Sequence, residues 1–180
     1  MIFRTALVYV VILCLLYACG VTPSRSAQQS AVLSLPAGGT PLIPDPKLTP
    51  GDVLPGVTAA DVCRPGYAKS VRDVPQSEKV QVYREYHMDP RHHPPTEIDH
   101  SISLENGGSN SIKNLWPEVL HIQVGSVDEG GKVKDTLEDK IHSLICGGKI
   151  TLQQGQEALR GDWRPAYLKY VGPFPKFVAH

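Results

Sequence analysis

The chain has 180 residues, of which 18 are Lys or Arg and 18 are Asp or Glu, so its formal net charge at pH 7 is zero. This balance excludes the strongly basic composition that is typical of proteins that bind nucleic acid through charge alone. The length fits one ordinary domain preceded by additional segments.

Residues 1–19 have the pattern of an export signal. One positive charge precedes an apolar run over residues 6–18, which is too short to cross a bilayer comfortably. The end of the run, Leu16-Tyr17-Ala18-Cys19, resembles a bacterial lipobox, which implies lipidation of Cys19 and attachment to a membrane. Tyr17 departs from the small residue usual at its position. Plain cleavage after Gly20 and an uncleaved anchor therefore stay open as alternatives.

The segment after the signal is rich in Pro, Ser, Ala and Gly. Five prolines preclude a regular helix or central strand there: Pro36, Pro41, Pro44, Pro46 and Pro50. We interpret residues 20–50 as a linker, residues 51–172 as the folded domain, and residues 173–180 as an irregular tail.

Two cysteines remain outside the signal region, Cys63 and Cys146. An exported chain meets an oxidising compartment, such as the periplasm or cell envelope, so we predict that these two form a disulfide. Neither belongs to a Cys-x-x-Cys pair, which disfavours a zinc site.

The predicted elements begin with extended chain over Val53–Tyr67. A helix follows Pro75, with Ser77 as its cap, and a proline-rich loop covers residues 87–95. No clear period marks residues 119–131.

Residues 131–146 are predicted to form an amphipathic helix that ends at Gly147. Its apolar face repeats at three- and four-residue steps: Val133, Leu137, Ile141, Leu144 and Ile145. Thr151 and Gln154 have the spacing of a capping box and start another helix. Asp162 is expected to cap a final short helix whose buried residues are Trp163, Tyr167 and Tyr170.

The stretch Glu97–Glu118 carries the chemistry of the chain. Asp99 and His100 are neighbours, the run Asn106-Gly107-Gly108 is a strong turn signal between two segments that could pair, and Asn114 follows His100 after fourteen residues. Neighbours in a strand point to opposite faces, so Asp99 and His100 serve one site only where the strand ends or bends.

This spacing resembles the HNH nuclease family, whose ββα-metal motif has an Asp-His pair on the first strand, a loop, and an Asn that holds the loop. The resemblance covers about residues 48–170, extends to a bacterial group of small exported HNH-like proteins, and includes these stretches: Cys63-x-Pro65-Gly66-Tyr67, Val71-Arg72, Val82-Tyr83-x-Glu85-Tyr86, Lys134-Asp135-x-Leu137-Glu138, His142, Cys146 and Asp162-Trp163. It implies an α+β fold with a small ββα-metal core and flanking helices.

The resemblance also implies a function, a metal-dependent endonuclease that hydrolyses phosphodiester bonds of nucleic acid, with DNA as the expected partner. His100 would be the general base, Asp99 a ligand of Mg²⁺ or Mn²⁺, and Asn114 the residue that positions the loop. We find no glycine-rich loop that would cradle a nucleotide, so no small-molecule cofactor is expected.

The third metal ligand departs from the family pattern. Gln123, a poor ligand, occupies the position where the family has His or Asn. The remaining candidates are His121, Asp135, Glu138 and His142, of which Glu138 and His142 share a helix face.

This gap supports an alternative, a non-catalytic exported envelope protein or lipoprotein that keeps the HNH-like scaffold for binding or structure. His100 lies in a polar stretch, so we expect His100→Ala to abolish cleavage while leaving the fold intact. Trp116 and Trp163 are expected in the core.

Overall fold

The computed structural model describes residues 41–179. The predicted signal, Cys19 and most of the predicted linker lie outside the described residues. The described chain mixes helices with two small sheets, which agrees with the α+β class. Within residues 41–179, no helix combines the length and apolar character needed to cross a membrane.

Both sheets are antiparallel hairpins. The first pairs β1 (Thr96–His100) with β2 (Leu115–Val119), so the two segments that could pair do so. The Asn-Gly-Gly run is not a tight turn, however, because it lies within a longer loop that contains two 3₁₀ turns, η1 (Leu104–Asn106) and η2 (Ile112–Asn114). The second hairpin joins β3 (Gln123–Val124) to β4 (Val127–Asp128).

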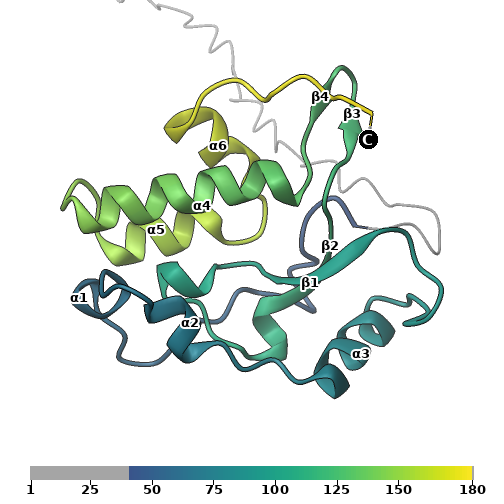
Figure 1. Cartoon of the computed structure of the whole chain (residues 1–180), viewed down its shortest axis with the longest axis horizontal. Helices are drawn as coiled ribbons and strands as arrows, with labels where there is room; N and C mark the ends of the chain where they lie inside the picture. Colours follow the sequence, from purple (N-terminus) through teal and green to yellow (C-terminus); the bar gives the residue numbers. More distant parts are fainter. Residues whose placement is uncertain (1–40, 180) are drawn as a thin grey trace, which may run out of the picture. The chain divides into compact units, whose positions relative to one another are not determined.

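Helix α4 (Gly131–Cys146) is the central element of the core and has the predicted bounds. Figure 1 shows it between α1 and α2 on one side and α6 on the other. It contacts α1, α5, α6 and η1. Its buried apolar residues have helical spacing because one face packs inward: Val133, Leu137, Ile141 and Ile145.

The expectation of extended chain over Val53–Tyr67 is wrong in its second half. A one-turn helix, α1 (Ala59–Val62), forms there because Thr58 and Asp61 cap each other's backbone N–H groups. Helix α2 (Tyr67–Val71) follows. Val53 remains extended and bridges to Gly108 of the central loop.

The other helices match their predictions except at their caps. Helix α3 (Gln76–Glu85) begins after Pro75, which takes the cap position expected for Ser77. The capping box of Thr151 and Gln154 starts α5 (Leu152–Leu159) as predicted.

Helix α6 (Arg164–Tyr170) begins after Trp163, which replaces Asp162 as the cap residue. Asp162 instead holds Arg164 through a 2.7 Å bond from Nε to Oδ1. Trp163 and Tyr167 are buried as expected, and so is Trp116, whereas Tyr170 is only half-buried.

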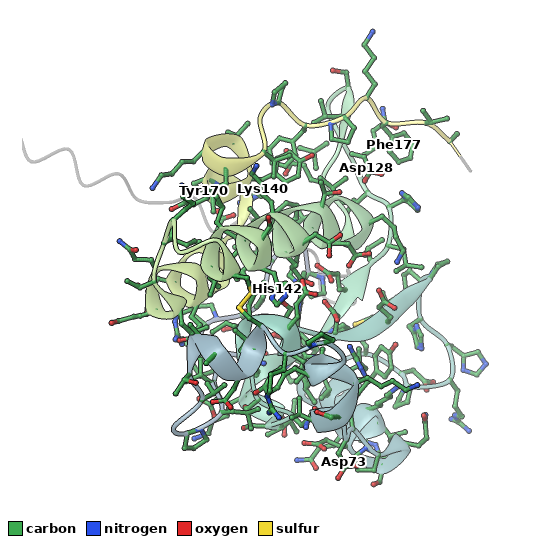
Figure 2. All side chains as sticks on the ribbon, turned by 60° about the vertical axis from the view of Figure 1, so that its left-hand side comes forward. Asp73, Asp128, Lys140, His142, Tyr170 and Phe177 are labelled. Atoms are coloured by element: carbon green, nitrogen blue, oxygen red, sulfur yellow. A yellow bond between two sulfur atoms is a disulfide. The ribbon has the colours of Figure 1, made fainter. Side chains whose placement is uncertain are left out.

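The segment after Gly172, expected to be irregular, adds to the second hairpin. Lys176 bridges to Val127, and the amide of Phe177 donates to the carbonyl of Ser126 at 3.1 Å. Figure 2 shows Asp128 and Phe177 together at this corner of the domain.

The predicted Cys63–Cys146 disulfide is present, with the two Cα atoms 5.6 Å apart. It joins the end of α1 to the last residue of α4 across 83 positions of sequence. A disulfide is typical of proteins in oxidising compartments, so this bond agrees with an exported protein.

Candidate functional site

The β1–β2 hairpin directs one polar face toward α4. Residues opposite each other in an antiparallel pair share a face, and the register pairs Glu97 with Glu118 and Asp99 with Trp116. Asp99 and Glu118 both face the side-chain nitrogen of Lys134 in α4. His100 points to the other side of the hairpin. Asp99 and His100 are the last two residues of β1, and their side chains have different partners, Lys134 for Asp99 and Asn110 for His100.

Asn114 holds the loop between the strands through both ends of its amide. Its Nδ2 donates to the carbonyls of Ile102 at 2.9 Å and Ser109 at 2.8 Å, and its Oδ1 accepts from the Ile102 amide at 2.9 Å. The loop packs so closely that a Cβ on Gly108 would lie 1.8 Å from the carbonyl oxygen of Ile102. Asn114 thus makes the loop-bridging contacts that the family resemblance implies.

Lys134, for which the sequence patterns indicate no role, is at the centre of the site. Its side chain is 1% exposed, and its Nζ donates to Asp99 Oδ2 at 2.8 Å and to the His100 carbonyl at 2.9 Å. A third bond goes to Glu138 Oε1, one turn further along α4. Glu118 Oε2 lies 3.7 Å from the same nitrogen. We call Asp99, Glu118, Lys134 and Glu138 the lysine cluster.

The charges of the lysine cluster balance at neutral pH. Burial opposes ionisation of Asp99, but the positive charge of Lys134 outweighs it and holds the pKa of Asp99 well below its usual range. Burial raises the pKa of Glu138 to about 8 and that of Glu118 well above its usual value, against the lowering effect of Lys134. The ammonium thus favours the ionised form of Asp99, while burial favours the protonated forms of Glu118 and Glu138.

His100 is enclosed on the opposite face of the hairpin. The residue is only 2% exposed, which corrects the expectation that it lies in an open polar hairpin. Asn110 donates to the Val71 carbonyl at 2.7 Å, so its Oδ1 is turned toward His100 Nε2 at 3.2 Å. Burial lowers the pKa of His100, although the charge of Asp99 opposes this. The ring is therefore neutral, with its Nε2 proton donated to Asn110.

The remaining predicted ligands have other partners. His121 Nδ1 lies 2.7 Å from Asp128 Oδ2 in the second hairpin. His142 bonds to the Glu105 carbonyl at 2.9 Å and faces Cys146 Sγ at 3.7 Å, as its place beside the sulfur atoms in Figure 2 shows. Asp135 pairs with Lys132 on the outer side of α4. The fold brings together only Asp99 and Glu138 from the predicted set.

The metal that the resemblance implies does not fit this arrangement. The Asp99 oxygen that faces α4 already accepts a hydrogen bond from an ammonium, and so does Glu138. In residues 41–179, no group of three His, Cys, Asp or Glu side chains forms a metal site in the folded chain, where the Lys134 ammonium lies among Asp99, Glu118 and Glu138.

Lys134, Glu118 and Asn110 were missed because charged and polar residues are usually exposed. One signal was present for Lys134. It precedes Leu137 by three residues and Ile141 by seven, which places it on the apolar face of the helix.

Comparisons with models of protein families, with curated proteins and with solved structures give no match. The chemistry of the site therefore has to be argued from its own contacts.

Proposed function

We propose that the described domain is a non-catalytic, exported domain that keeps an HNH-like hairpin and helix as a scaffold for binding or structure. The observation that carries this proposal is that all three N–H donors of the Lys134 ammonium are already engaged. An ammonium has three N–H donors, and in Lys134 they go to Asp99, the His100 carbonyl and Glu138. No donor remains for a phosphate oxygen.

The environment of His100 supports the same proposal. A general base has to reach the proton that it removes, directly or through one water. His100 is buried and its Nε2 is engaged by Asn110. While Nε2 keeps its proton on Asn110, this nitrogen cannot remove a proton from a water.

The charges near the lysine cluster also disfavour a polyanionic substrate. The cluster has no net positive charge, and near Glu97 the acids Asp99 and Asp135 stand beside Lys132 and Lys134, so no excess of cations forms there. Affinity for nucleic acid comes mainly from cations placed against phosphates. The neutral composition of the whole chain supplies no excess of cations either.

The test is a cleavage assay on the exported protein purified from a bacterial host. Supercoiled plasmid and single-stranded RNA are incubated with protein in Mg²⁺, in Mn²⁺ or in EDTA, and His100→Ala protein serves as the matched control. We expect wild-type and His100→Ala protein to give the same background in every buffer. Cleavage by the wild type that disappears in His100→Ala would overturn the proposal.

A nuclease is the second candidate, and one observation favours it. Asp99 and His100 lie at the end of β1, and Asn114 braces the following loop, as an HNH site requires. Catalysis with Mg²⁺ or Mn²⁺ would require Asp99 to leave Lys134. Cleavage that depends on the added metal and on His100 is the result that would support this candidate.

A further inference from the structure

The surroundings of the Lys134 nitrogen consist of oxygen atoms from three parts of the chain. Asp99 and the His100 carbonyl come from β1, Glu118 from β2, and Glu138 from the next turn of α4. Such a set of carboxylate and carbonyl oxygens around one point is the environment that hard divalent cations prefer.

Glu118 shows that the ammonium does not satisfy all of these oxygens. Its side chain is 3% exposed and faces the Lys134 nitrogen at 3.7 Å, so neither of its oxygens bonds to that nitrogen, and its hydrogen-bond partner is the Asp99 carboxyl group instead. Buried polar atoms are normally paired. A lysine, with three donors, reaches three of the four groups, whereas a divalent cation with a higher coordination number would reach them all.

We propose that the Lys134 ammonium stands in the place of a divalent cation and makes the lysine cluster independent of metal. The oxygens of Asp99, Glu118 and Glu138 become a site for Mn²⁺ or Mg²⁺ only when this ammonium is removed. The inference shares its observation with the proposed non-catalytic function but concerns binding alone. It would stand even if the wild type proved to cleave nucleic acid without metal.

Two substitutions separate the charge of Lys134 from its volume. Lys134→Ala removes the ammonium and leaves space for an ion with water ligands. Lys134→Met removes the ammonium but fills the space with an apolar chain. Mn²⁺ is the probe, because its electron paramagnetic resonance signal reports the bound ion directly and thermal melting reports its effect on the fold.

We expect the wild-type and Lys134→Met proteins to show no binding of Mn²⁺ that depends on Asp99. Their melting temperatures should not respond to Mn²⁺. Lys134→Ala should bind Mn²⁺ and should melt at a higher temperature when the ion is added, since a ligand of the folded state stabilises it. Adding Asp99→Asn to Lys134→Ala should weaken Mn²⁺ binding by roughly tenfold or more. Replacing a residue that supports a metal site commonly has an effect of this size.

Two results would overturn the inference. One is wild-type protein that binds Mn²⁺ and loses this binding in Asp99→Asn, because the ammonium would then not occupy the place of the ion. The other is Lys134→Ala protein that does not respond to Mn²⁺. Its spectrum and melting temperature would stay the same or, if it is unfolded, Mn²⁺ would not make it fold. Neither result depends on a cleavage assay, so failure of this inference is distinguishable from failure of the proposed function.

Discussion

The two halves of helix α4 both pack in the apolar core, but only the first half also carries a buried charge. The first half carries Lys134, whose contacts are hydrogen bonds and ion pairs to the β1–β2 hairpin and to the next turn of the helix. The second half carries Ile141 and Ile145, which pack among apolar residues of α1, α5 and α6, and it ends in the disulfide at Cys146.

This difference bears on how the helix is positioned. Apolar contacts are non-directional, so the second half tolerates small shifts of its partners. The bonds of Lys134 have fixed directions and end on particular atoms of β1. The first half therefore sets the register between helix and hairpin, while the second supplies general burial.

The largest effect is expected where the polar half loses its charge. Lys134→Met should lower the free energy of unfolding by about 3–5 kcal/mol at pH 7, because Asp99, which is 23% exposed, and Glu138 lose the ammonium to which both bond. Urea denaturation measures the loss. Lys140, exposed on the same helix, gives the matched control, and Lys140→Met should change stability by less than about 0.5 kcal/mol. Equal effects of the two substitutions would contradict the distinct role of Lys134.

The apolar half should respond to truncation but not to pH. Ile141 is fully buried, and Ile141→Ala should cost about 2–5 kcal/mol through lost burial and the cavity left behind. Because no ionisable group is removed, we expect nearly the same loss at pH 5 and pH 8. A loss that varied strongly with pH would mean that the two halves are coupled.

The disulfide strengthens the second half further. Replacing Cys63 and Cys146 together by Ser should lower the free energy of unfolding by about 2–4 kcal/mol, as the unfolded chain gains conformational freedom. The same denaturation experiment measures this. Intact protein should also gain about two mass units on reduction, and a mass that does not change on reduction would mean that the thiols are free in solution.

The last prediction separates the halves by pH, and over a single pH unit its effect is the smallest. The pKa of Glu138 is raised to about 8 in the folded protein, whereas an unfolded Glu titrates near about 4.3. Between these values the folded state holds a proton that the unfolded state has lost, so stability should fall as pH rises from about 5 to 8. The slope from Glu138 is at most about 1.4 kcal/mol per pH unit. Glu138→Gln should flatten the profile, and an unchanged slope would assign it to Glu118.

The sequence predicted the apolar half of α4 well and the polar half poorly. Periodicity located Leu137, Ile141 and Ile145, because an apolar face that repeats at helical steps is typical of a helix packed on a core. Lys134 and Glu118 gave no comparable signal. A charged residue is buried only when distant parts of the chain supply partners, and those partners become visible only once the hairpin and helix are packed together.

The same reason explains His100. Its neighbours in sequence are polar, which predicted exposure, but Asn110 and Val71 cover it from a loop and from α2. The loop-bridging contacts of Asn114 agree with a local spacing, whereas the pairing of Asp99 with Lys134 did not follow from it. The short helix α1 was missed although its capping pair, Thr58 and Asp61, is local as well.

The bridge between Lys176 and Val127 has a consequence for the order of assembly. Lys176 follows Val127 by almost fifty residues. A chain is synthesised from its N-terminal end, so the β1–β2 hairpin and α4 can meet before Lys176 is available. The C-terminal segment then closes over elements that are already together, which places its docking late in assembly.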